Sequence, residues 1–160
     1  MKLFIRQKIF SFKDRYSVVD ENNRPVFQVE GQLFSFGAKI RVYDMQGGEL
    51  FYIEQKLFRF LPEYMVYQGS NLCARIQKQF SFLKPRLHME SAYGDFDIDG
   101  SFWGMDFNIS LNNKLMGSIQ KSWFTFGDAY EMTIADGADA ALFVTLVIAI
   151  DHCLHNNNNS

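Results

Sequence analysis

Lys8-Ile9-Phe10-Ser11-Phe12 is the first of six copies of a short aromatic phrase that decides the architecture of this chain. The later copies follow at intervals of roughly 22 to 24 residues, and they are Gln32-Leu33-Phe34-Ser35-Phe36, Lys56-Leu57-Phe58-Arg59-Phe60, Lys78-Gln79-Phe80-Ser81-Phe82, the degenerate Gly100-Ser101-Phe102-Trp103-Gly104 and the stretched Lys121-Ser122-Trp123-Phe124-Thr125-Phe126. A period of this length indicates that one supersecondary unit is repeated along the sequence.

Each repeat has the pattern of a β-hairpin, because apolar and polar residues alternate on both sides of the phrase. The pair Ile40/Val42 shows the alternation, and Gln46-Gly47-Gly48 is one of the turn signals that separate the repeats. Six hairpins give twelve short strands, which in an open sheet would expose two unpaired edges and one apolar face. We therefore predict a mainly β fold, a closed antiparallel barrel of about twelve strands.

The last part of the sequence predicts a different element, an apolar helix from Gly137 to Leu154. Asp136 is a good N-cap residue, and Asp139 lies near the positive end of the helix dipole. The stretch from Ala140 to Ile150 is apolar except for Thr145, and such a helix must be surrounded by lipid or by protein. About 11 apolar residues fall short of the roughly 20 that span a bilayer. We therefore predict that the helix lies buried inside the barrel.

Length and composition indicate one domain. A chain of 160 residues with 48% hydrophobic content can bury a substantial core, which we assign to residues 1–155, followed by a disordered polar tail at 156–160. The 16 basic and 18 acidic residues nearly cancel, so global charge gives no argument for nucleic-acid binding. Cys73 and Cys153 lack the companions of a zinc site and predict reduced, buried thiols in a cytoplasmic protein. Charge interrupts the apolar N-terminus, and we expect neither a signal peptide nor a transmembrane segment.

A meander of hairpins gathers all within-hairpin turns at one end of the barrel and all between-hairpin turns at the other. The basic residues near the within-hairpin end are candidates for binding lipid headgroups or other anions, and they are Lys8, Lys13, Lys39, Lys56, Arg59, Lys78, Lys84, Arg86 and Lys121. The acidic residues near the other end are Asp20, Glu21, Asp44, Glu49, Glu90, Asp95 and Asp97. In the alternative interpretation, the repeated Phe residues turn inward to plug the barrel and the lysines only keep this end soluble.

The segment Asp95-Phe96-Asp97-Ile98-Asp99-Gly100, with Asp106 at the twelfth position, matches a calcium-binding EF-hand loop at its first, third, fifth and sixth positions. The candidate metal ligands are therefore Asp95, Asp97, Asp99 and Asp106. Against a calcium site, Asp106 replaces the usual Glu and the segment falls in the fifth hairpin, where the aspartates would face solvent.

Catalytic motifs and cofactor fingerprints are absent from the sequence, which contains no GxSxG elbow, Walker loop or HExxH. We therefore expect neither an enzyme nor a bound cofactor. His88 should point outward from its strand. His152 and His155 lie at the end of the predicted helix, where we expect them to cap it.

The hairpin meander, the strand Asp128-Ala129-Tyr130-Glu131-Met132-Thr133-Ile134 and the Ala135-Asp136-Gly137 approach to the apolar helix resemble the LURP-one-related family, which is related to the tubby C-terminal domain and the phospholipid scramblases. The opening Phe4-Ile5-Arg6-Gln7-Lys8 is typical of small bacterial members. The resemblance covers nearly the whole chain and implies a closed twelve-stranded barrel around a C-terminal helix. Tubby domains bind phosphoinositide headgroups and scramblases act at membranes, and no tubby phosphoinositide ligand is carried over to a residue of this chain. Of the calcium segment proposed for the scramblases, the matching stretch retains Asp128, Glu131, Asp136 and Asp139 in scattered positions.

Two hypotheses of function follow. The first is a non-enzymatic binding module whose basic aromatic end engages anionic phospholipid headgroups or a phosphorylated partner. The second is a scaffold barrel that docks on another protein without lipid affinity. Binding that is lost at high salt, and lost when Lys84 and Arg86 are changed to Glu, would favour the first hypothesis.

Overall fold

The structure is a computed structural model and describes residues 1–6, 15–34, 37–57, 60–79, 86–102, 104–124 and 127–155. The strands among these residues are β1 (Lys2–Arg6), β2 (Arg15–Asp20), β3 (Pro25–Phe34), β4 (Gly37–Tyr43), β5 (Glu49–Lys56), β6 (Glu63–Gln68), β7 (Asn71–Gln79), β8 (Arg86–Ser91), β9 (Gly94–Ser101), β10 (Asp106–Leu111), β11 (Lys114–Phe124) and β12 (Gly127–Ile134). One helix, α1 (Ala140–His155), follows the last strand.

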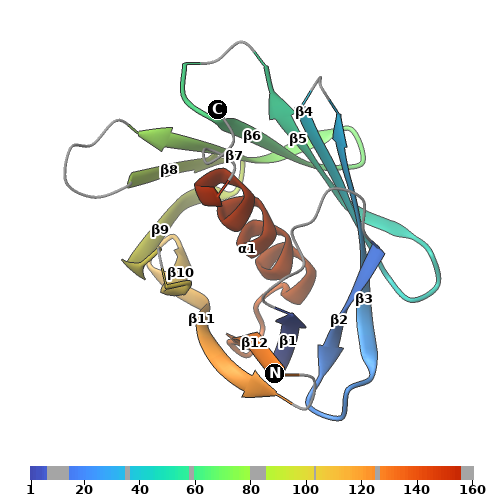
Figure 1. Ribbon diagram of the computed structural model, residues 1–160. Helices are drawn as coiled ribbons and strands as arrows, with labels where there is room; N and C mark the ends of the chain where they lie inside the picture. Colours follow the sequence, from blue (N-terminus) through green and yellow to red (C-terminus); the bar gives the residue numbers. More distant parts are fainter. Residues whose placement is uncertain are drawn as a thin grey trace.

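The described strands form a closed antiparallel barrel in which each strand pairs with its neighbours in sequence, and β1 closes the circle against β12 (Figure 1). The predicted six hairpins and the predicted closure are therefore confirmed. Closure leaves the barrel without a pair of terminal edge strands, which explains how a twelve-stranded meander avoids exposing them.

The pairing is uneven around the barrel. Among the described residues, most neighbouring strands share five or more paired positions, whereas β1 and β2 share two pairs, and β8 and β9 also share two, Glu90↔Asp95 and Ser91↔Gly94. A bulge or shift in register occurs in four strand pairs that connect one hairpin to the next, and these are β2/β3, β4/β5, β6/β7 and β10/β11. The shift in β4/β5 lies between Val42 and Tyr43. Bulges increase the local twist of a strand pair, which helps a sheet of this size to curve.

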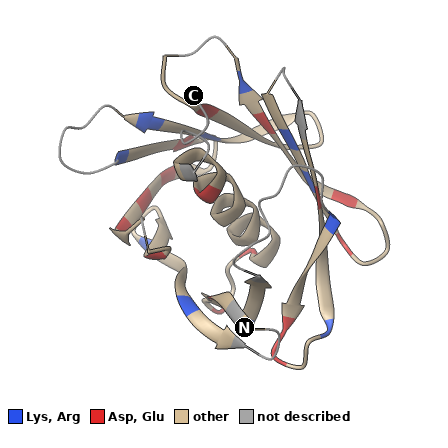
Figure 2. Cartoon of the chain, in the orientation of Figure 1, with Lys and Arg blue, Asp and Glu red and all other residues tan. Residues whose placement is uncertain are grey.

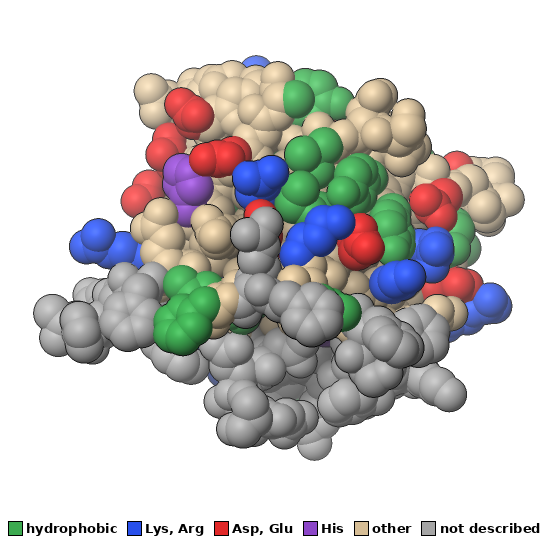
Figure 3. Space-filling view, turned by 90° about the horizontal axis from the view of Figure 1, so that it is seen from above, with side chains coloured by type: hydrophobic (Ala, Val, Ile, Leu, Met, Phe, Trp, Pro, Cys, Tyr) green, Lys and Arg blue, Asp and Glu red, His purple; other side chains and the backbone are tan. Residues whose placement is uncertain are grey.

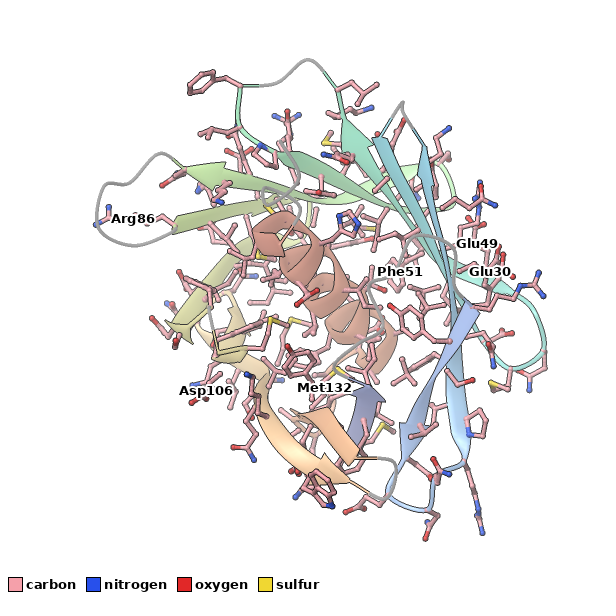
Figure 4. All side chains as sticks on the ribbon, viewed as in Figure 1. Glu30, Glu49, Phe51, Arg86, Asp106 and Met132 are labelled. Carbon is pink, nitrogen blue, oxygen red and sulfur yellow. The ribbon has the colours of Figure 1, made fainter. Side chains whose placement is uncertain are left out.

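Helix α1 lies inside the barrel, as predicted (Figure 1). Its 16 residues span about 24 Å, and its side chains from Leu142 to Leu154 are all buried. Inward-facing strand residues such as Phe51 and Met132 surround it, while Glu30 and Glu49 point away from the barrel (Figure 4). Full burial of a large apolar side chain contributes about 1.5–3 kcal/mol to the free energy of folding. The helix and the barrel wall therefore depend on each other for stability.

The helix begins three residues later than the sequence predicts. The Leu142 amide donates to Asp139 Oδ1 at 2.9 Å, which makes Asp139 the N-cap in place of Asp136. Gly137 precedes the helix in a turn, with a φ of +76° that favours glycine. The prediction of a helix from Gly137 was therefore wrong at this end, because the second of two suitable aspartates is the one that reaches the free amides.

A close approach between the helix and the wall occurs at Gly117 in β11. A Cβ atom at this position would lie 2.5 Å from the Thr133 carbonyl oxygen and 2.9 Å from Cε2 of Phe143. The Phe143 ring is fully buried and occupies the space that a side chain at position 117 would need. Gly117 thus permits the first turn of α1 to pack directly on the backbone of the barrel.

Candidate functional site

The within-hairpin connections lie at one end of the barrel, which we call the hairpin rim, and the between-hairpin connections lie at the opposite rim. Five of the predicted anion-binding residues belong to strands that end at the hairpin rim, and they are Lys39, Lys56, Lys78, Arg86 and Lys121. The other four, Lys8, Lys13, Arg59 and Lys84, lie outside the described residues. The described cations come from five different strands (Figure 2).

Three of these cations belong to the outer face of the barrel. Lys39 lies between the buried residues Ala38 and Ile40, so the alternation of the strand directs it outward. Lys56 Nζ bonds Glu54 Oε2 at 3.2 Å, which offsets its charge. Arg86 is exposed at the end of β8, far from the helix (Figure 4), and makes no ion pair among the described residues.

Lys78 and Lys121 share the inward-facing side of their strands with core residues. Lys78 follows Ile76 by two positions and Lys121 follows the buried Ile119 by two, and both reach the mouth of the barrel at the hairpin rim. Lys78 is close to Cys153 near the C-terminal end of α1. Burial raises the pKa of the Cys153 thiol to about 12, and the nearby Lys78 ammonium opposes part of that rise. Neither lysine forms an ion pair among the described residues.

The hairpin rim also carries exposed aromatic side chains. Phe60, the last residue of the third phrase, is 90% exposed, and Trp123 of the sixth phrase is 79% exposed. Phe102 of the fifth phrase instead turns inward, with its ring centroid 5.8 Å from that of Phe107. The interpretation that the repeated Phe residues turn inward to plug the barrel is therefore wrong for Phe60 and agrees with Phe102. The residues of the other phrases that lie outside the described residues are Phe10, Phe12, Phe36, Phe58, Phe80, Phe82 and Phe126.

Beneath the hairpin rim, the last turns of α1 bring polar groups into the barrel. Tyr64 Oη lies 2.9 Å from Nδ1 of His152, and both residues are buried. The pKa of Tyr16 is raised by burial and further raised by the Asp151 carboxylate. The prediction that His152 caps the helix was wrong, since its ring bonds Tyr64, and the side chain of His155 lies outside the described residues.

Sequence reasoning did not identify this polar cluster. Its signal is present nonetheless, because Asp151 and His152 interrupt an otherwise apolar helix, and Tyr64 falls at an inward-facing strand position. Buried polar groups require hydrogen-bond partners, so polar residues on a buried helix should have been matched with polar residues that line the barrel.

Two of the acidic residues predicted at the opposite rim, Asp20 and Asp44, have structural roles in turns. Asp20 Oδ1 accepts the amides of Asn22 and Arg24 at 2.8 and 2.9 Å. Asp44 Oδ1 accepts the amides of Gln46 and Gly48 at 2.9 and 2.7 Å. Both aspartates stabilise the connections between hairpins, as Asp side chains commonly do in turns.

The EF-hand-like segment forms strand and not a calcium loop. Asp95, Asp97 and Asp99 occupy alternate positions on the exposed face of β9, where the sequence alternation places them, and Asp106 begins β10. An extended strand separates alternate residues by about 6.5–7 Å, so their carboxylates do not converge as ligands in a loop do. The described residues contain no group of three or more His, Cys, Asp or Glu that could hold a metal ion.

Predictions for single residues at other positions are confirmed. His88 is exposed on β8, with Nε2 2.9 Å from Glu90 Oε1. Cys73 and Cys153 are free and buried.

Aromatic side chains also lie on the outer wall formed by β4, β5 and β6. The rings of Tyr52 and Tyr67 stack with centroids 6.1 Å apart, and the Arg41 guanidinium lies 4.9 Å above Tyr52. Arg41 also pairs with Glu49 at 3.1 Å. Hydrophobic, basic and acidic side chains are interleaved on this face (Figure 3), so it offers no concentrated positive charge to an anion.

Comparisons with known proteins agree with this fold. The chain is 32% identical over 159 residues to "Uncharacterized protein YxjI" of Bacillus subtilis (strain 168), covering 99% of this chain and 97% of that protein. An X-ray structure of a protein from Arabidopsis thaliana superposes with a TM-score of 0.68 at 15% identity, covering 94% of this chain and 88% of the other. At that identity, the plant structure shows a shared fold alone.

Two further findings bear on identity and on membranes. Among the described residues, no helix combines the length and the apolar character needed to cross a bilayer. The family model named LURP-one-related matches residues 1–151, which is nearly the entire barrel and most of α1. The chain therefore belongs to the LURP-one-related family.

Proposed function

We propose that the protein is a non-enzymatic binding module whose hairpin rim engages anionic phospholipid headgroups at a membrane surface. The observation that carries this proposal is the exposure of Trp123 and Phe60 at the same end of the barrel as Lys78, Arg86 and Lys121. Phe60 and Trp123 are the two most exposed large hydrophobic side chains among the described residues.

The two kinds of side chain complement each other at a membrane. An anionic surface attracts a nearby Lys or Arg by about 1 kcal/mol per residue. Trp favours the interface between headgroups and acyl chains because its ring is apolar while its indole N–H can donate a hydrogen bond. Lys121 and Trp123 lie two residues apart on one strand, so both would reach the interface together.

The protein has an excess of acidic residues, so attraction of the basic rim to an anionic membrane can be distinguished from attraction by the net charge of the whole protein. The formal net charge is −2, so binding to anionic vesicles would have to come from the rim. A rim variant, Arg86→Glu/Lys121→Glu, reverses two exposed rim charges. Arg24→Glu/Lys114→Glu makes the same change in net charge at exposed positions of the opposite rim.

The test is co-sedimentation with neutral vesicles, phosphatidylserine vesicles and phosphoinositide vesicles at low and at physiological salt. We expect binding to the anionic vesicles that weakens with salt, is lost in the Arg86/Lys121 variant and persists in the Arg24/Lys114 variant. Equal loss in both variants, or no binding to any vesicle, would overturn the proposal. The second outcome would leave the alternative, a protein-docking scaffold with no lipid affinity.

We also infer a cytoplasmic location. Cys73 and Cys153 are both buried as free thiols, and a reducing compartment keeps cysteines in that state. Cell fractionation checks this inference, and we expect the protein in the cytoplasmic fraction and on the cytoplasmic surface of the membrane. Recovery from an oxidising compartment would contradict it.

A further inference from the structure

The strand pairing of the barrel wall is interrupted at the seam between β8 and β9. The ladder between these strands stops after Glu90↔Asp95, next to the turn. In contrast, β7 pairs with β8 over six positions and β9 pairs with β10 over six positions. Figure 1 shows β8 and β9 diverging from their shared turn. Beyond that turn, each strand is therefore paired on one side alone within the described residues.

The backbone groups that face the seam can be identified from the hydrogen bonds of β9. The Asp95 carbonyl accepts the Asn112 amide at 2.9 Å, and the Asp95 amide donates to Asn112 Oδ1 at 3.0 Å, so Asp95 directs its backbone groups away from β8. Backbone groups alternate between the two edges of a strand. Phe96 and Ile98 therefore direct their amides and carbonyls into the seam, in line with Gly94, which pairs with Ser91 of β8.

The two faces of the seam differ in chemistry. Toward the interior, Phe96 is buried, and Ile98 and Leu87 are half-buried and pack against the core. Toward solvent, β9 presents Asp97 and Asp99, and the row of acidic residues along β9 is visible in Figure 2.

These carboxylates are not neutralised by their cross-strand neighbours. Asp97 is opposite Ser110 on β10, and Asp99 is opposite Asn108. Neither aspartate forms an ion pair among the described residues. On the β8 side the outward residues are Arg86, His88 and Glu90, and Glu90 Oε1 lies 2.9 Å from His88 Nε2. The carboxylates without such a partner among the described residues of the seam are therefore those of β9.

We propose that the β8/β9 seam is a docking site for an extended basic peptide segment, which adds as a strand to the free edge of β9. Its backbone would bond Phe96 and Ile98, its apolar side chains would face Ile98 and Leu87, and its Lys or Arg side chains would face Asp97 and Asp99. Strand addition of this kind takes its affinity from main-chain hydrogen bonds and its specificity from alternate side chains. The aspartates that match a calcium loop in the sequence occupy every second position because they lie on one face of a strand.

The edge itself is tested in the free protein by residue-resolved amide hydrogen exchange. We expect Phe96 and Ile98 to exchange quickly, while Asp97 and the doubly flanked Ile109 of β10 exchange slowly. Equal protection of Ile98 and Ile109 would show that the edge is already covered and would overturn the proposal.

The docking is tested with a fluorescent eight-residue peptide of alternating Val and Lys. Two further peptides carry N-methyl groups, one on all Val amides and the other on all Lys amides. Each set of methyl groups removes the backbone hydrogen-bond donors along one edge of the peptide strand and leaves the charge of the peptide unchanged. We expect the parent peptide to bind and to protect the Phe96 and Ile98 amides. At least one methylated peptide should bind about tenfold more weakly, which matches the loss of two or three hydrogen bonds.

Matched charge variants complete the test. Asp97→Lys/Asp99→Lys should weaken binding of the parent peptide by about tenfold or more, whereas Glu21→Lys/Asp136→Lys, at exposed positions of the opposite rim, should leave it unchanged. If both methylated peptides bind as tightly as the parent, or if both charge variants lose binding equally, the interaction is non-specific attraction and the proposal fails. Vesicle binding by the hairpin rim is measured in a separate experiment, so failure of peptide docking would not affect the proposal of membrane binding, and the reverse also holds.

Discussion

The replacement Gly117→Ala tests directly how closely α1 packs on the barrel wall. Gly117 lies outside the left-handed region of backbone conformation, so an alanine can adopt its backbone angles. At an unobstructed site, Gly→Ala stabilises a protein by about 0.4–1 kcal/mol, because it reduces the freedom of the unfolded chain. The sign of the effect therefore reports on the space around position 117.

The structure predicts a loss of stability. The new Cβ would lie 2.5 Å from the Thr133 carbonyl oxygen and 2.9 and 3.0 Å from two atoms of the Phe143 ring. The backbone oxygen cannot move without disturbing the ladder between β11 and β12, and the ring is enclosed on all sides. Overpacking of this kind costs about 1–3 kcal/mol. In a chain of this length, that loss lowers Tm by about 2–4 °C for each kcal/mol.

The assay is urea unfolding followed by circular dichroism, with Gly31→Ala as the matched control. Gly31 is also a strand glycine, and a Cβ there would meet nothing within 4 Å. We expect Gly31→Ala to be neutral or stabilising. The double variant Gly117→Ala/Phe143→Leu should lose less than the sum of its single variants, because the smaller side chain relieves the contact. If Gly117→Ala is as well tolerated as Gly31→Ala, the Phe143 ring does not pack against the backbone at Gly117.

Three further predictions concern α1 and its surroundings. Tyr64→Phe should lower the free energy of unfolding by about 1–3 kcal/mol, because the buried His152 ring loses a hydrogen bond; no change in urea unfolding would contradict that bond. Asp139→Ala should cost about 0.5–2 kcal/mol and Asp139→Asn much less, since Asn also caps; equal losses would argue against a capping role. Burial and the Asp151 carboxylate raise the pKa of Tyr16, so the unfolded state releases this proton first and stability should fall as pH rises above about 10. Tyr16→Phe should make that decline shallower, and an unchanged slope would show that Tyr16 does not contribute.

The barrel could be predicted from the sequence because its signals are local and repeated. The phrase at Lys56-Leu57-Phe58-Arg59-Phe60 recurs with a nearly constant period, and alternation such as Ile40/Val42 sets which side of each strand faces the core. The buried helix was predictable for a related reason, since the stretch from Ala140 to Ile150 has no polar face to offer to water.

Finer features depend on contacts between distant residues. Asp136 and Asp139 are equally good caps in the sequence, and the choice between them is made by the turn that carries the chain from β12 to α1. The partner of His152 is Tyr64, 88 residues away, and no local pattern connects them.

The candidate sites were only partly predictable. Topology places the cations at the hairpin rim, and the alternation along each strand indicates which of them face outward, as Lys39 does, or inward, as Lys121 does. The register between strands is less predictable, because it is shifted by bulges such as the one between Val42 and Tyr43, which have no clear sequence signal. The divergence of β8 from β9 likewise has no signature in the alternation of Asp97, Ile98 and Asp99.

Insertion of the hairpin rim into a membrane surface is tested most directly by the fluorescence of Trp123. The chain has two tryptophans, so Trp103→Phe leaves Trp123 as the sole reporter. Trp123 is 79% exposed in the free protein, and its emission should therefore be that of a solvated indole. With phosphatidylserine vesicles, we predict a blue shift and quenching by lipids brominated near the headgroup, and neither effect with neutral vesicles or in the Arg86→Glu/Lys121→Glu background. If the protein sediments with anionic vesicles while the Trp123 emission stays that of a solvated indole, the hairpin rim is not the surface that meets the membrane.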